Sequence, residues 1–249
     1  MLFRNIKGQY QFLEGIEPYS CGVIAETGYE IVHATFTEPL PWREGFEKVD
    51  VHLRRSSRVR NALCGVELRC PKPHPMDGFI EFNEDYCALL ASWGLHVDGM
   101  NPVARTNVAP LHNPPDDTTM YGFSYTAPCR EEHGRTFVIA GAGELLKGEL
   151  VRDGIVRQGE TGPDAMREKA AYVAHVMADR LAGLGVNWDQ VTAVDVYTAH
   201  RLDRLLEDVV LPDVGAAQRH GLRLYRARPP VIGIEFEMDL RGIRREIRI

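Results

Sequence analysis

The second half of the chain switches between helical and strand spacing of its apolar positions. Between Asp164 and Leu184, apolar residues recur every three or four positions, which predicts an amphipathic helix. A further helix, interrupted by Pro212, is expected over Arg201–Gln218, because proline cannot continue the helical hydrogen bonds. Short apolar or alternating runs predict strands at Thr136–Ala140, Val191–Tyr197, Leu222–Ala227 and Val231–Leu240.

The first half gives nearly the same order of elements. Strands are expected at Cys21–Ala25, Tyr29–Phe36, Leu63–Cys70, Val103–Ala109 and Met120–Thr126, with helices at Phe46–Arg58 and Phe79–Leu95. Both halves therefore read β-β-α-β-α-β-β, which indicates an internal duplication with its boundary near Pro128–Gly134. We expect an α+β fold of two units, residues 1–130 and 131–249. Each unit would be a β-sheet with two helices on one face, and the other face would pack on another sheet.

Composition and charge narrow the class of protein. The 249 residues are 44% hydrophobic and 26% charged, as in an ordinary globular protein with a sizeable core. A net charge of −6 argues against a nucleic-acid partner. The apolar runs fall far short of the roughly 20 residues that span a membrane, and the start lacks an apolar signal core, so a cytoplasmic location is expected.

Cysteine and histidine spacing gives no sign of a disulfide framework or a metal site. The five cysteines are an odd number without a Cys-x-x-Cys pair, so we expect reduced thiols. The nine histidines are scattered without His-x-x-x-His spacing, and no metal is expected.

Two groups of charged residues stand out against apolar neighbours. Arg105 lies in an apolar strand, where a guanidinium needs an anionic partner: a ligand carboxylate held by two parallel hydrogen bonds, or an internal acid. Glu235 and Glu237 alternate with apolar residues and share one side of a strand. If burial raises its pKa, such a carboxyl group can handle the protons of a water molecule. Two glutamates on an exposed sheet surface would give the same pattern.

Four segments, taken together, carry a family resemblance. Glu17–Gly22 (EPYSCG), Pro102–Ala109 (PVARTNVA), Gly185–Thr198 (GVNWDQVTAVDVYT) and Ile234–Glu237 (IEFE) resemble segments of the RidA/YjgF family in the order that the family has them. This family consists of enamine/imine deaminases built from small trimeric units. The resemblance covers most of the chain as two divergent copies, and it implies tandem units of the chorismate-mutase-like fold.

The resemblance also implies roles for individual residues. Arg105 would grip the substrate carboxylate, and Glu235 would position the catalytic water. Tyr19, Asn107, Gly141 and Glu237 would bind substrate. No cofactor is implied, because an imine is already electrophilic. Three chains would supply six units, so a homotrimer is the natural closed assembly.

Each copy lacks one of the site residues that the family pattern has. In the second copy the arginine position falls near Gly221, and in the first the closing strand Tyr121–Tyr125 has no glutamate. The halves would then combine into one composite pocket, or each would have lost part of the chemistry. The favoured function is hydrolytic deamination of a small enamine or imine carboxylic acid to a 2-oxo acid and ammonia. The alternatives are a specialised hydrolase, either aminomuconate deaminase-like or chorismatase-like, and a non-catalytic subunit that binds a small carboxylate.

Overall fold

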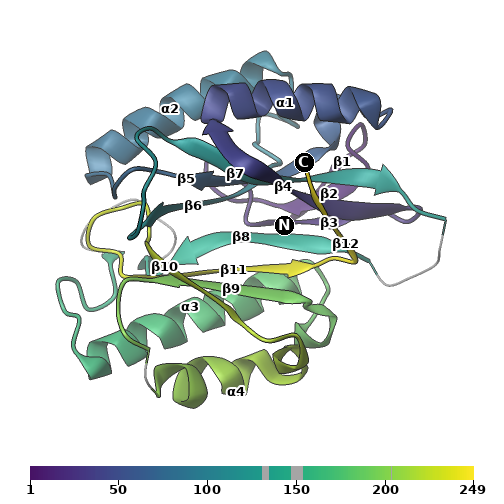
Figure 1. Cartoon of the computed structure of the whole chain (residues 1–249). Helices are drawn as coiled ribbons and strands as arrows, with labels where there is room; N and C mark the ends of the chain where they lie inside the picture. Colours follow the sequence, from purple (N-terminus) through teal and green to yellow (C-terminus); the bar gives the residue numbers. More distant parts are fainter. Residues whose placement is uncertain (131–134, 147–153, 203) are drawn as a thin grey trace.

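The helices and strands of the computed structural model form a layered arrangement of two sheet regions between two pairs of helices. The structure describes residues 1–130, 135–146, 154–202 and 204–249. In Figure 1 the helices α1 (Trp42–Arg55) and α2 (Met76–Ser92) cover one outer face, and α3 (Pro163–Gly183) and α4 (Leu211–Val214) cover the other. The strands lie between the two helical layers. The expected boundary after residue 130 adjoins residues 131–134, which lie outside the described part of the chain.

The first half builds a four-stranded part of the sheet under α1 and α2. Its strands are β4 (Tyr29–Pro41), β5 (Leu63–Arg69), β6 (Ala104–Pro110) and β7 (Thr119–Pro128). Their order is β6-β5-β7-β4, with β5 and β6 parallel and the other pairs antiparallel. Helix α1 buries Phe46, Val49 and Leu53 in this core, and their three-to-four spacing explains why one face of the helix packs on the sheet.

The second half repeats this topology beside α3. Its strands are β8 (Phe137–Gly143), β9 (Ala193–Thr198), β10 (Arg223–Arg228) and β11 (Phe236–Gly242). They run in the order β10-β9-β11-β8, again with one parallel pair, β9 and β10. Each strand of the second half therefore occupies the same place in the order as its counterpart in the first. Helix α3 packs Val173, Met177 and Leu181 into the core of this half.

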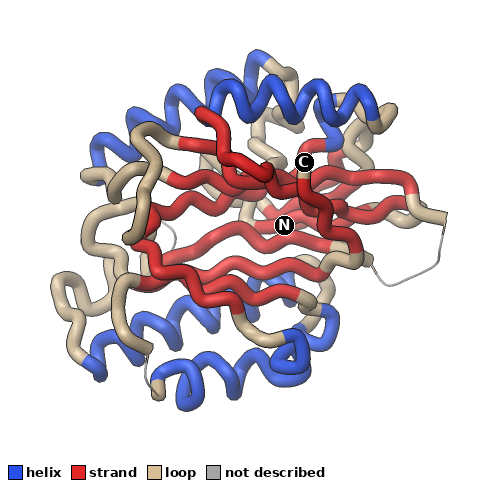
Figure 2. The backbone as a smooth tube through the Cα atoms, in the orientation of Figure 1, coloured by secondary structure: helices blue, strands red, loops and turns tan. Residues whose placement is uncertain are grey.

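Strand pairing joins the two halves into one twelve-stranded sheet. β10 pairs antiparallel with β6, at Ala227–Pro110 and Arg228–Ala109. On the other side of the second half, β3 (Gly22–Ala25), β2 (Tyr10–Leu13) and β1 (Leu2–Asn5) follow β8; beyond β4 lies β12 (Arg245–Arg248). The backbone of Ser20, just before β3, pairs with Ala104 of β6, so the sheet curls until its two parts face each other (Figure 2).

The structure confirms most expected elements and corrects some boundaries. The strand expected from Val231 begins only at Phe236, because Gly233 takes a positive φ of 97° that interrupts extended backbone. The helix expected over Arg201–Gln218 is present from Leu206 to His220, but its geometry changes along its length: a π-helix at Leu206–Val210, then α4, then a 3₁₀-helix at Gly215–His220. Strands β1, β2 and β12 were not predicted. Further 3₁₀ turns are found at Arg60–Ala62 and Trp188–Gln190.

Apolar side chains between the two sheet regions hold the layers together. Tyr10, Val23, Ile31, Ala104 and Val138 belong to a buried cluster drawn from both halves. Cys21, Cys64, Cys70 and Cys87 are free thiols. None of the helices in the described residues is long and apolar enough to cross a membrane.

Candidate functional site

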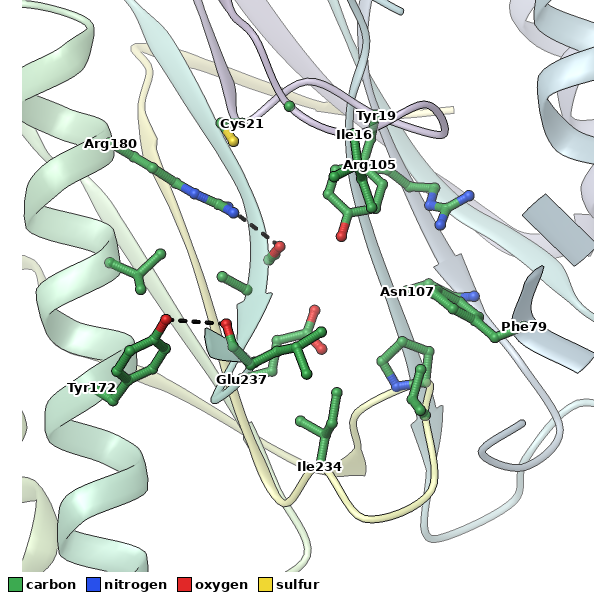
Figure 3. Close-up of a pocket in the computed structure, with 18 of the residues that line it drawn as sticks. Ile16, Tyr19, Cys21, Phe79, Arg105, Asn107, Tyr172, Arg180, Ile234 and Glu237 are labelled. Atoms are coloured by element: carbon green, nitrogen blue, oxygen red, sulfur yellow. Dashed lines mark hydrogen bonds between the residues drawn. The ribbon is translucent and has the colours of Figure 1, made fainter. Parts of the chain in front are cut away.

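A cavity of about 380 Å³ lies where the two halves meet. The loop before β3, the start of α2 and strand β6 line it from the first half, and β8, α3 and β11 line it from the second (Figure 3). Five of the six site residues expected from the sequence contribute to its wall: Tyr19, Arg105, Asn107, Gly141 and Glu237. The cavity is therefore composite, since neither half contains all of these residues.

Arg105 reaches the cavity from β6 without an acidic partner. Its side chain is buried, with 3% of the residue exposed. Nη2 donates a hydrogen bond to Asn83 Oδ1 of α2 at 2.7 Å, whereas Nη1 is buried without a partner. In the described part of the chain, no carboxylate lies within ion-pair distance of this guanidinium. The internal ion pair that the sequence left open as an alternative is thus not what the structure contains.

Aromatic rings take the place of an acid around Arg105. Its guanidinium carbon lies 4.6 Å from the ring centre of Tyr86 and 5.1 Å from that of Tyr19. Phe79 and Phe82 approach to 5.5 and 5.8 Å. Such rings stabilise a cation through their negative faces but do not neutralise it. Burial lowers the pKa of Arg105 from its usual value, which reflects the cost of holding this charge away from water.

Asn107 follows Arg105 on the same face of β6, as the two-residue repeat of a strand requires. Its side chain is buried, and both the amide nitrogen and the amide oxygen lack a hydrogen-bond partner among the described residues. A buried amide without partners is costly, unless a ligand satisfies it. Thr106 between them points to the opposite face, where its hydroxyl accepts a hydrogen bond from the backbone N–H of Gly141 at 3.1 Å.

Gly141 of β8 lets the carboxyl group of Glu237 approach the backbone closely. A Cβ atom at position 141 would overlap Glu237 Oε1 and would also press on Thr106. The absence of a side chain here therefore makes room for the carboxyl group of the neighbouring strand. This close approach explains why a glycine, rather than any small residue, occupies this part of the cavity wall.

The surroundings of Glu237 favour the protonated form of its carboxyl group. Burial raises the pKa of Glu237 well above its ordinary value, and the nearby acids Asp239 and Glu144 raise it further. Arg180 and Arg105 act in the opposite direction but do not outweigh the loss of solvation. A buried carboxyl group that has a raised pKa and borders a cavity is suited to general acid–base chemistry.

Glu235 lies elsewhere, although the sequence placed it on the same strand face. It precedes β11, and its Oε2 lies 2.7 Å from His200 Nε2 and 3.4 Å from Arg228 Nη1. Glu235 is not among the residues that line the cavity. The expected pairing of both glutamates on one face is therefore wrong, because Glu235 lies before the start of β11 at Phe236.

A buried ion pair fixes the start of β11. Glu144 accepts hydrogen bonds from the backbone N–H groups of Glu235 and Phe236 at 2.7 and 3.0 Å. Lys169 of α3 lies 3.0 Å from the same carboxylate, and both side chains are fully buried. This contact anchors the backbone directly before Glu237 and so positions its carboxyl group. Sequence analysis missed both residues, because they lie far apart in the chain and match no motif.

Arg180 is a second guanidinium in the cavity wall that the sequence did not single out. It extends from α3 and lies on the opposite side of the cavity from Arg105 in Figure 3. Its Nη1 donates to the carbonyl oxygens of Ala140 and Gly141 at 2.8 and 3.4 Å. The polar position of Arg180 in an amphipathic helix was the available signal, but exposed arginines give the same pattern.

A separate group of charges lies deeper between the sheets and contains its own counter-ions. Arg241 of β11 lies 2.7 Å from Glu67, 2.6 Å from Asp195 and 3.3 Å from Asp239. We refer to these four residues as the Arg241 cluster. Burial, together with Asp195, raises the pKa of Asp239 to about 7. The cluster joins β5 of the first half to β9 and β11 of the second.

The described residues contain no group of three histidine, cysteine or acidic side chains arranged to hold a metal ion. The cavity offers two cations, a carboxyl group with a raised pKa and an unpartnered amide, with aromatic rings on one wall. This set of groups fits a small organic acid, because the cations match carboxylates and the carboxyl group can exchange protons.

Comparison with known proteins gives a match over almost the whole chain. The family model described as "2-aminomuconate deaminase CnbZ" matches residues 2–247. A 2-amino-5-chloromuconate deaminase from Comamonas testosteroni is 39% identical over 242 residues, which are 96% of this chain and 95% of that enzyme.

Solved structures give weaker similarities. A chorismatase structure matches over 92% of this chain and 78% of its own, with a TM-score of 0.44 and 14% identity. A putative endoribonuclease from Thermotoga maritima matches over 44% of this chain and 79% of its own, with a TM-score of 0.28 and 19% identity.

Proposed function

We propose that this chain, which belongs to the 2-aminomuconate deaminase CnbZ family, hydrolytically deaminates a small unsaturated amino acid of the enamine type. The products would be a 2-oxo acid and ammonia. The observation that carries the proposal is the buried carboxyl group of Glu237, whose pKa is raised, in the same cavity as the guanidinium of Arg105, which has no acidic partner among the described residues. The 39% identity to a 2-amino-5-chloromuconate deaminase supports 2-aminomuconate or a close analogue as the substrate.

Arg105 would hold the carboxylate next to the amino-bearing carbon. Its Nη1 has no partner and its charge has no internal acid, so a substrate carboxylate would satisfy both. Asn107, with both ends of its amide unpartnered, would accept a hydrogen bond from the substrate's amino group. Tyr19, which points its hydroxyl group into the cavity, would stack against the substrate's planar carbon chain (Figure 3).

The reaction would begin with a proton transfer from Glu237 to carbon. The enamine double bond takes up the proton at its far carbon, and the amino-bearing carbon becomes an iminium ion. Glu237 is left as a carboxylate, which Arg180 and Arg105 stabilise electrostatically. A carboxyl group with a raised pKa is suited to this step, because it keeps its proton to a higher pH than an ordinary glutamate does.

The same carboxylate would then assist the attack of water. It takes one proton as the water oxygen bonds to the iminium carbon, which gives a carbinolamine. Glu237 returns that proton to nitrogen, ammonia leaves, and the hydroxyl proton passes back to Glu237 as the 2-oxo group forms. The enamine and one water molecule thus become a 2-oxo acid and ammonia, and Glu237 is again protonated.

Ammonia release from freshly generated 2-aminomuconate tests the proposal. Replacing a general acid–base group typically lowers the rate by about 10²–10⁴-fold, and we expect this loss in Glu237→Gln. Glu235→Gln is the matched variant, because it makes the same change two residues away, outside the cavity. We expect it to retain most activity. A Glu237→Gln enzyme with wild-type turnover would contradict the proposal, and so would a wild-type protein that releases no ammonia.

We further propose that residues 1–130 and 131–249 are two divergent copies of a RidA-like unit. The shared strand orders β6-β5-β7-β4 and β10-β9-β11-β8, each with one parallel pair in the same place, support this proposal. The cavity at the junction of the halves fits a family whose sites lie between neighbouring units. A homotrimer remains a prediction; sedimentation equilibrium would then give three times the chain mass of 28.0 kDa.

A further inference from the structure

Arg180 has no part in substrate binding in the reaction above, yet its position in the cavity wall suits it to that purpose. Two backbone carbonyl oxygens, those of Ala140 and Gly141, hold its Nη1. Its hydrogen bonds within the described residues engage only this nitrogen, and no carboxylate there lies within ion-pair distance. The half-buried guanidinium is thus fixed in direction by the backbone but keeps Nε and Nη2 for a ligand.

We propose that Arg180 binds the second carboxylate of an unsaturated dicarboxylic acid, at the opposite end of the substrate from Arg105. The inference rests on the proposed function, because it takes the substrate's first carboxylate to lie on Arg105. Figure 3 shows the two arginines on opposite sides of the cavity. Both guanidinium groups act electrostatically on Glu237. An acid held at its two ends therefore has its carbon chain beside the carboxyl group that moves the protons.

The charges of the cavity favour a dianion over a monoanion. Arg105 and Arg180 carry two positive charges, and burial favours the uncharged form of Glu237. Glu14 is the remaining charged residue of the lining, but its side chain is exposed and water screens it. A monocarboxylate would leave one guanidinium without an anion, whereas a dicarboxylate matches both.

The size of the cavity agrees with a short diacid. Its volume of about 380 Å³ falls near the lower end of the range of roughly 300–1,000 Å³ that is typical of small-molecule sites. Apolar side chains also line the cavity, among them Ile16, Val176 and Ile234. They suit the hydrocarbon part of an acid whose charges lie at its ends.

Two stable acids that differ only at the far end test the role of Arg180. 2-Oxoadipate and 2-oxohexanoate have the same six-carbon chain, but the first ends in a carboxylate and the second in a methyl group. Calorimetric Kd values give the preference of each protein for the diacid. The carboxylate of 2-oxoadipate can make charge-assisted hydrogen bonds to Arg180, whereas the methyl group of 2-oxohexanoate makes none. We therefore expect the wild type to bind 2-oxoadipate about 10- to 100-fold more tightly.

The variants separate a binding role from a structural one. Arg180→Met removes most of the preference for 2-oxoadipate, and Arg180→Lys retains part of it, because lysine keeps the charge but not the planar fork. Arg105→Met weakens the binding of both acids. Arg167→Met is the matched control on the same helix, where the arginine is exposed and paired with Asp208, and it leaves the preference as in the wild type.

An undiminished preference in Arg180→Met would overturn the inference, and so would an equal loss of affinity for both acids, which indicates structural damage alone. The failure of the proposed function looks different. If the wild type shows the Arg180-dependent preference but releases no ammonia from 2-aminomuconate, the deaminase proposal fails and the dicarboxylate site stands. If ammonia is released but the preference for 2-oxoadipate does not depend on Arg180, the deaminase proposal stands and the dicarboxylate site fails.

Discussion

Arg105 and Arg241 are equally buried, with 3% and 2% of each residue exposed, but their surroundings differ completely. Arg241 contacts three carboxylates within its cluster, drawn from both halves of the chain. Arg105 contacts an asparagine and a set of aromatic rings, and one of its nitrogens has no partner. One guanidinium is neutralised by the fold, whereas the other is left for an anion from outside.

The comparison shows how a buried charge that stabilises the fold differs from a buried charge that is available to a ligand. A charge buried with its counter-ions connects parts of the fold, and removing one partner leaves the others uncompensated. A charge buried without a counter-ion weakens the fold and is compensated only when a ligand binds. The cavity and the Arg241 cluster show both cases within one sheet, and substitutions can tell them apart.

The largest expected effect is on stability, at Arg241. Arg241→Met leaves Glu67, Asp195 and Asp239 buried together without their cation, and we expect the free energy of unfolding to fall by about 3–5 kcal/mol. Arg105→Met is the matched control, because it removes an equally buried guanidinium that has no acid. Urea denaturation of the two variants measures the contrast. Equal destabilisation by both substitutions would show that Arg105 is structural as well.

Substitution of Arg105 should also lower the activity. Arg105→Met removes the charge-assisted hydrogen bonds to the substrate carboxylate, which contribute about 1.5–3 kcal/mol each, so kcat/KM for ammonia release should fall by about 100-fold. Arg105→Lys should restore little, since a lysine lacks the planar fork. Steady-state kinetics at several substrate concentrations measures the loss. Normal kinetics in Arg105→Met would assign the carboxylate to another residue.

Glu237 predicts a pH-dependent difference in stability. Its pKa in the folded protein is raised above the ordinary value of 4.5, so above pH 4.5 the folded state keeps a proton that the unfolded state loses. Wild-type stability therefore falls with rising pH relative to Glu237→Gln, by up to about 1.4 kcal/mol per pH unit until the folded pKa is reached. Thermal unfolding of both proteins from pH 4 upward measures the gap. A gap that does not widen would place Glu237 in an ordinary, ionised state.

The smallest expected effect is at Asn107. Asn107→Ala removes one neutral hydrogen bond to the substrate, worth about 1 kcal/mol, and so lowers kcat/KM by roughly fivefold. The folded protein should become slightly more stable, because an unpartnered buried amide is lost. Kinetics and urea denaturation together check the two opposite signs. Loss of both stability and activity would mean that the amide has a structural partner.

The part of the cavity wall that β6 contributes could be predicted from the sequence. Arg105 was identifiable as a charge with apolar neighbours in a predicted strand. Asn107 came from the family resemblance, and the two-residue repeat of β6 places it on the same face as Arg105. The repeated order of strands and helices was also visible in the spacing of apolar residues. These features are local, and local spacing is what a single sequence records.

The rest of the site depends on contacts between distant segments. The positive φ of Gly233 shifts the start of β11, which separates Glu235 from Glu237, although the alternating pattern placed them together. The contact of Lys169 with Glu144, and the approach of Arg180 to the cavity, both arise from how α3 packs on the sheet. The spacing of residues along the sequence does not predict how α3 packs on the sheet.

The proposed reaction requires that Arg105 receives a substrate carboxylate in the composite cavity. A crystal structure of the complex with 2-oxoadipate would show whether it does. We expect one carboxylate within hydrogen-bond distance of the Arg105 guanidinium, and the 2-oxo carbon beside Glu237. An acid bound outside the cavity, with Arg105 still bonded only to Asn83, would rule out this role for Arg105.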